Sequence, residues 1–135
     1  LSLDLRSPSK ETLNKAFEIL KSEATAVAKR RGVSVEFEVL LDLDPCPCSG
    51  DLIQQLETAV RETGVSAIQM PSGAGHDGMS MSKLTDIGMI FVRCKGGISH
   101  NPAESVTARD VGAGAAAILQ FVRNFEQKRK MRGEQ

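Results

Sequence analysis

Apolar and polar residues alternate along two stretches of the chain, and this spacing predicts two β-strands. The first stretch covers Leu1 to Arg6, and the second covers Val33 to Leu43. Because successive side chains of a strand point to opposite faces, Arg6 is expected on the polar face of the first strand. The second stretch is the longer one and is the clearest strand pattern in the sequence.

Between the two stretches, apolar residues recur at helical spacing from Leu13 to Val27. Ser9 provides a start signal for this helix, and Gly32 provides a stop signal after two arginines. The order strand, helix, strand predicts one half of a small α+β sandwich.

The pattern changes at Asp44 to Gly50, where two prolines and a glycine mark an internal boundary. Beyond it, a helix is expected from Leu52 to Val60, and the apolar run Ile87 to Val92 predicts a strand that is buried on both faces and has helices on both sides. A glycine- and alanine-rich helix from Arg109 to Phe125 is expected to pack closely through its backbone. Two shorter elements are expected as well, a strand at Ala67 to Met70 and a helix at His76 to Leu84.

Composition narrows the classes of partner. The chain has 135 residues, no Trp, no Tyr and an aromatic share of 4%, which disfavours surfaces that stack on nucleic-acid bases. Lys plus Arg equals Asp plus Glu at 17 each, so no net field attracts nucleic acid or an anionic membrane. The three cysteines lack C-x-x-C spacing, so neither a disulfide framework nor a structural zinc site is indicated. A small-molecule or protein partner is favoured.

Both histidines lie between Met70 and Glu104, where glycines are densest. The loop Pro71 to Gly75 can bind an anion or carbonyl through its amides, although a tight turn before a helix has the same spacing. His76 follows this loop and is either a structural donor or a catalytic group. His100, four residues before Glu104, is either a metal ligand oriented by that carboxylate or a surface-loop histidine.

The residues do not form a complete catalytic pattern. Two histidines without an H-E-x-x-H motif fall short of the three protein ligands that a catalytic zinc generally needs, and no G-x-S-x-G motif is present. Arg6 is a candidate clamp for a carboxylate, because guanidinium binds carboxylates bidentately, but a surface charge is the commoner role.

Three segments resemble the C-terminal third of a family of dinuclear-metal amidohydrolases. They are Ser72 to Asp77, Gly88 to Arg93 and Gly97 to Glu104. The family includes N-carbamoyl-L-amino-acid hydrolases and the allantoate and ureidoglycolate amidohydrolases, and it is related to aminoacylase-like metallopeptidases. Leu1 to Arg6 also resembles a strand of the family's lid domain.

The resemblance implies roles for individual residues. His100 matches the last ligand of a centre with two divalent ions, Mn²⁺ or Zn²⁺. Arg6 matches the arginine that binds the substrate carboxylate. The residues that line the family's substrate pocket are matched by Gly73, Ala74, Gly75 and His76. The other ligands and the glutamate general base match no residue of this chain, so none of its residues is expected to act as a catalytic acid or base.

The resemblance also implies an α/β architecture. Residues 1–46 are expected to form the second half of an α+β, ferredoxin-like lid that makes a homodimer, and residues 47–135 the C-terminal part of an α/β metallopeptidase-like catalytic domain. Because the chain opens directly on a strand pattern without an initiator Met, we expect a fragment.

The implied function is metal-dependent hydrolysis of a non-peptide C–N bond in a ureido or carbamoyl acid, such as allantoate from purine catabolism or an N-carbamoyl-L-amino acid. The chain alone is expected to be inactive. The alternative is a truncated, non-catalytic fragment or dimerisation partner of such an enzyme. The implied compartment is the cytoplasm in a bacterium or an organelle such as the endoplasmic reticulum in a plant.

Overall fold

The computed structural model describes the backbone of residues 1–132 and the side chains of residues 1–125. The end of the predicted 47–135 domain therefore lies outside the described residues. The chain divides into two compact units, which are described separately. The first comprises Leu1–Pro47 and Pro71–Gly75, and the second comprises Cys48–Met70 and His76–Gln135.

The first unit contains helix α1, Lys10–Arg31, which begins and ends where the sequence predicts. The Oγ of Ser9 accepts a hydrogen bond from the Thr12 amide at 3.2 Å and caps the first turn. Gly32 adopts φ 67°, a left-handed conformation that suits glycine, and its amide donates to the last carbonyls of the helix. Local capping signals therefore fix both ends of α1.

The strands expected on either side of α1 are absent, and residues 1–132 contain no β-strand. A strand exists only when a neighbouring segment completes its ladder of backbone hydrogen bonds, and no such ladder joins Leu1–Arg6 to Val33–Leu43. The strand–helix–strand half-sandwich is thus not formed as a sheet by these residues.

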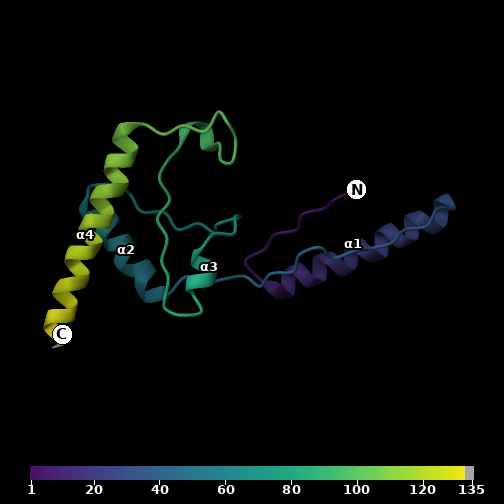
Figure 1. The fold of residues 1–135 in the computed structure, drawn as a ribbon, viewed down its shortest axis with the longest axis horizontal. Coiled ribbons are helices and arrows are strands. Elements are labelled where there is room, and N and C mark those ends of the chain that lie inside the picture. Colours follow the sequence, from purple (N-terminus) through teal and green to yellow (C-terminus); the bar gives the residue numbers. More distant parts are fainter. Residues whose placement is uncertain (133–135) are drawn as a thin grey trace. The chain divides into compact units, whose positions relative to one another are not determined.

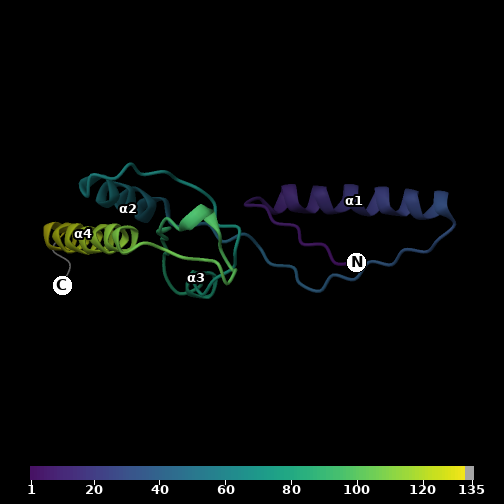
Figure 2. The same ribbon diagram turned by 90° about the horizontal axis from the view of Figure 1, so that it is seen from above.

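The segment after α1 nevertheless returns alongside the helix, as Figures 1 and 2 both show. Lys10, at the start of α1, forms ion pairs with Asp42 and with Asp44, the latter at 3.1 Å. A helix of 22 residues is about 33 Å long, which an extended segment of about ten residues can span. The eleven-residue apolar pattern therefore has the length needed to run beside α1.

The second unit is built around helices α2, Gly50–Glu62, and α4, Ala108–Arg132, which pack against each other (Figures 1 and 2). Ala59 of α2 is 0% exposed and Ala117 of α4 is 3% exposed. Two short elements complete the unit, α3 at Gly78–Met81 and a 3₁₀ turn, η1, at Lys95–Gly97. The buried apolar side chains of the two helices are accordingly small, and Gln55 of α2 is buried with them.

The apolar run Ile87 to Val92 crosses this helix pair through close contacts at glycines. An added Cβ on Gly88 would lie 2.8 Å from Cδ1 of Leu56 in α2. The prediction that this run is a strand buried on both faces is wrong, since Phe91 and Val92 remain 51% and 43% exposed. Within the run, Ile87, Met89 and Ile90 are half-buried, and none of its residues is fully buried. None of the described helices is both long and apolar enough to cross a bilayer.

Candidate functional site

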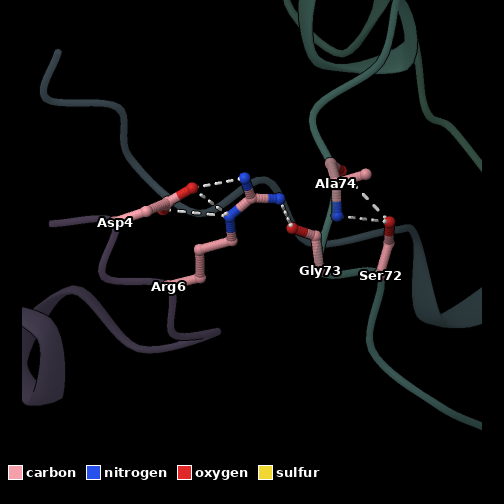
Figure 3. Close-up of polar contacts among 5 residues, drawn as sticks. All are labelled: Asp4, Arg6, Ser72, Gly73 and Ala74. Atoms are coloured by element: carbon pink, nitrogen blue, oxygen red, sulfur yellow. Dashed lines mark hydrogen bonds and ion pairs between the residues drawn. The ribbon is translucent and has the colours of Figure 1, made fainter. Parts of the chain in front are cut away.

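Arg6 is held by a carboxylate two residues before it (Figure 3). Its Nε donates to both oxygens of Asp4 at 3.0 and 3.1 Å, and its Nη2 donates to Oδ2 at 2.5 Å. Residues at positions i and i+2 of an extended segment share a face, so the sequence Asp4-Leu5-Arg6 places the two charges together. Both side chains remain more than half exposed.

The same guanidinium reaches the glycine loop of the first unit. Nη1 of Arg6 donates to the carbonyl oxygen of Gly73 at 2.5 Å, although 67 positions separate the two residues (Figure 3). The structure thereby brings together two residues that the sequence singles out as substrate-binding. This contact uses a carbonyl of the loop, so it does not occupy the loop's backbone amides.

Ser72 organises the interior of this loop. Its Oγ accepts from the Ala74 amide at 3.2 Å and donates to the Ala74 carbonyl at 3.1 Å (Figure 3). The Ala74 amide is therefore already engaged. The backbone amides of Gly73 and Gly75, in contrast, have no hydrogen-bond acceptor among the described residues.

The pair Asp4–Arg6 shifts the titration of both groups. The hydrogen bond from Arg6, aided by its positive charge, lowers the pKa of Asp4 below the usual carboxyl value. The hydrogen bond to Asp4 and the Coulomb attraction raise the pKa of Arg6. At neutral pH the site is consequently a charged pair.

His76 lies in the second unit, at the entrance to α3. Its Nδ1 accepts a hydrogen bond from the Gly78 amide at 2.9 Å, so the neutral imidazole carries its proton on Nε2. Asp77, the N-cap residue of α3, makes no side-chain capping hydrogen bond. The imidazole instead satisfies this helix end and presents Nε2 as a donor.

His100 lies in a loop whose ends are joined by a hydrogen bond from the Lys95 amide to the Ser105 carbonyl at 2.8 Å. Its φ of 55° is the left-handed conformation that few non-glycine residues adopt. Glu104 was expected to orient the imidazole, but its Oε2 accepts from the His100 backbone amide at 3.0 Å. The carboxylate therefore holds the backbone at His100 rather than its ring.

The described residues do not assemble a metal centre on their own. Among the described side chains, those of residues 1–125, no three His, Cys, Asp or Glu residues come close enough to hold an ion together. His100 offers one exposed imidazole, whereas a catalytic metal generally takes at least three protein ligands. These residues alone therefore do not fit the two-ion centre that the resemblance implies.

Two residues of the site were missed by the sequence reasoning. Asp4 binds Arg6, and the i, i+2 spacing of opposite charges in an alternating segment was the available signal. Gly78 lies beneath the His76 ring, with an added Cβ only 2.4 Å from Cε1, and nothing in the sequence reveals that contact.

Residues 6–124 match the peptidase family M20/M25/M40, and the chain belongs to this family. The chain is also similar to proteins that are named as an N-carbamoyl-L-amino acid amidohydrolase and as an allantoate deiminase. It is 36% identical over 125 residues to the N-carbamoyl-L-amino acid amidohydrolase of Geobacillus stearothermophilus, covering 93% of this chain and 31% of that protein. It is 37% identical over 129 residues to the allantoate deiminase of Arabidopsis thaliana, covering 90% of this chain and 25% of that protein.

A solved structure shows the same fold. The chain superimposes with a TM-score of 0.77 and 34% identity on a Burkholderia cenocepacia protein assigned as an amidohydrolase/peptidase, covering 87% of this chain and 29% of that one. The family resemblance drawn from the three motifs is thus confirmed. The chain spans less than a third of the length of these relatives.

Proposed function

We propose that the protein containing this chain is a metal-dependent amidohydrolase that cleaves a non-peptide C–N bond in a carbamoyl or ureido acid. N-Carbamoyl-L-amino acids and allantoate are the proposed substrates. The observation that carries this proposal is the contact between the Arg6 guanidinium and the Gly73 carbonyl, because it brings a carboxylate-binding group to a glycine loop. Family membership and the names of the two relatives support the reaction class.

Arg6 would bind the substrate carboxylate. Guanidinium remains charged at every physiological pH and matches the planar geometry of a carboxylate. Its side chain is 60% exposed, so a ligand has access to it. Every proposed substrate carries at least one carboxylate, and this shared group is what Arg6 would recognise.

The glycine loop would contact the rest of the substrate, and the same role is proposed for His76 from the family resemblance alone. The amides of Gly73 and Gly75 are donors for its carbonyl or carboxylate oxygens, and absent side chains let a ligand approach the backbone. Nε2 of His76 would donate to a developing negative charge, since its Nδ1 is already occupied. These residues bind and orient the substrate, and none is proposed as the general base.

His100 is proposed as one ligand of a centre with two divalent ions, Mn²⁺ or Zn²⁺. The family assignment supports metal dependence. Such ions supply Lewis acidity when bound. The remaining ligands would have to come from residues other than those described, in keeping with the share of its relatives that the chain spans.

The architecture implied by the resemblance is proposed in the same terms. Residues 1–46 would be the second half of an α+β lid that pairs in a homodimer, and residues 47–135 the C-terminal part of an α/β catalytic domain. Neighbouring strands supplied by the rest of the protein would complete the ladders that are missing from Leu1–Arg6 and Val33–Leu43.

The test is hydrolysis by the complete gene product. N-Carbamoyl-L-amino acids and allantoate are supplied separately, with Mn²⁺ or Zn²⁺, and release of the amino acid or ammonia is measured. Arg6→Lys is expected to raise KM at least about tenfold, because the bidentate fork is lost. Arg31→Lys, at the exposed end of α1, is the matched control and is expected to leave KM unchanged. Absence of turnover on every substrate, with metal bound, would refute the proposal.

A second function is favoured by the exposed apolar positions of the first unit. Val33, Val39 and Leu41 are 60%, 61% and 75% exposed, which suits a chain that serves only as a non-catalytic dimerisation partner. The two functions differ in metal content. Stoichiometric metal and turnover in the gene product would exclude the non-catalytic one.

A further inference from the structure

The Asp4 carboxylate occupies one whole edge of the Arg6 guanidinium. Both of its oxygens lie within 3.1 Å of Nε, and Oδ2 also accepts from Nη2. This is the side edge of the guanidinium, formed by Nε and one terminal nitrogen, and a bidentate carboxylate fills it. A second carboxylate cannot bind along the same edge.

The remaining donors of Arg6 are thereby defined. A guanidinium has five N–H groups, of which Nε–H and one N–H of Nη2 are bound by Asp4. One N–H of Nη1 is bound by the Gly73 carbonyl. Among the contacts of the described residues, one N–H on each terminal nitrogen is left over. Those two donors face away from the edge that Asp4 fills.

We propose that Asp4 is a positioning residue for Arg6. Asp4 fixes the guanidinium so that a substrate carboxylate meets only the terminal nitrogens. This inference rests on the carboxylate-binding role proposed for Arg6. Arginine has a long side chain with several rotatable bonds, and a free one would occupy many rotamers. The two anchors, Asp4 on one edge and the Gly73 carbonyl on Nη1, restrict it to one orientation beside the loop (Figure 3).

Because Asp4 is exposed, an effect of its replacement on substrate binding can be told apart from an effect on folding. Its side chain is 64% exposed, and ion pairs between exposed groups contribute little to stability. Replacing Asp4 should therefore leave the protein folded and alter only the orientation of Arg6. The negative charge of Asp4 also opposes a second anion nearby, so a purely electrostatic role would make substrate binding stronger after its removal. A positioning role makes binding weaker, and the two roles predict opposite signs.

The experiment compares Asp4→Asn with Asp42→Asn in the complete gene product. Asp42 is a good control, because its side chain is 63% exposed, it also pairs with a cation, and its substitution changes the net charge equally. Asp4→Asn is expected to raise KM for a carbamoyl amino acid about tenfold with little change in kcat, since binding to Arg6 is weakened. Asp4→Glu, which restores the carboxylate, is expected to recover most of the loss. KM for the corresponding N-carbamoyl amino-acid amide, in which an amide replaces the carboxylate, should not change.

A KM for Asp4→Asn that equals or falls below that of Asp42→Asn, in a protein that turns over its substrate, would overturn the proposal while leaving the function intact. A second readout does not depend on turnover. With ¹⁵N-arginine labelling, the Arg6 Nε–H signal should exchange slowly in the wild type and rapidly in Asp4→Asn, and acetate should shift the terminal nitrogens only in the wild type. That result in an inactive protein would support the positioning role and refute the proposed function; an Nε–H signal unchanged by Asp4→Asn would refute the positioning role.

Discussion

Gly114 of α4 lies directly against the side chain of Val92, and a Cβ added to the glycine would come within 2.8 Å of Val92 Cγ2. The other glycine of this helix segment, Gly112, has nothing within 4 Å of the same added atom. The glycine-rich sequence of α4 thus serves close packing at one position and not at its neighbour two residues earlier.

We expect Gly114→Ala to be less stable than Gly112→Ala by about 1–3 kcal/mol, because an overpacked contact is added only at the first site. Val92 is β-branched and cannot rotate freely away from the new methyl group. Gly112→Ala should itself be stabilising by up to about 1 kcal/mol, since alanine is the better helix former. Urea denaturation of both variants measures the difference. Equal stabilities would show that Val92 does not press on Gly114.

The helices were predictable because their signals are local. Helix α1 begins after Ser9 and ends before Gly32, as the sequence indicates, because Ser9 provides a side-chain cap and Gly32 adopts a left-handed conformation. The strands were not realised, because alternation states which face a segment would bury but not whether a neighbour is present. Val33–Leu43 has the pattern of a strand, but among the described residues no neighbouring strand is joined to it by a ladder of backbone hydrogen bonds.

The candidate site was predictable only residue by residue. The chemistry of a guanidinium singles out Arg6 as a carboxylate-binding residue, and the roles of His76 and His100 stay predictions. The contact of Arg6 with Gly73 spans 67 positions, and no local pattern encodes such a pairing. Glu104 shows the converse, since its spacing from His100 was correct for a contact but the contact is made to the backbone amide and not to the ring.

The Asp4 carboxyl is expected to titrate below the ordinary aspartate value of about 3.9, because Arg6 stabilises its ionised form. A lowered pKa means that the Asp4–Arg6 attraction is fully present above the ordinary carboxyl range and is lost as the pH falls through the lowered value. Carboxyl ¹³C chemical shifts followed against pH give the midpoint.

Arg6→Met should return this midpoint to the ordinary range, whereas Arg31→Met, which removes a charge at the far end of α1, should not. Added salt should also raise the Asp4 midpoint in the wild type, because the pair is exposed and therefore screened. A wild-type midpoint at the ordinary value would contradict the pair in solution.

His100 occupies a left-handed backbone conformation that glycine adopts without strain. We expect His100→Gly to be more stable than His100→Ala by about 1 kcal/mol in metal-free protein, since both lose the imidazole but only glycine relieves the strain. Both variants should lose metal affinity to the same extent if His100 is a ligand. Thermal denaturation and metal content after dialysis separate the two effects. Full metal occupancy in both variants would remove His100 from the ligand set.

Alternate residues of Val33–Leu43 form an exposed apolar row, in which Val35 and Phe37 are 39% and 37% exposed. Unpaired backbone beside such a row is a site for association with another chain. We therefore expect the 135-residue chain to self-associate with increasing concentration, as measured by sedimentation velocity.

Phe37→Glu should shift this association toward the monomer, because it places a charge within the apolar row. Ser34→Glu adds the same charge at an even-numbered position, which lies on the opposite face of an extended segment, and should have a smaller effect. If the two variants dissociate the chain equally, net charge and not the apolar row governs association. If the wild type stays monomeric at every concentration, the row does not act as an interface in the isolated chain.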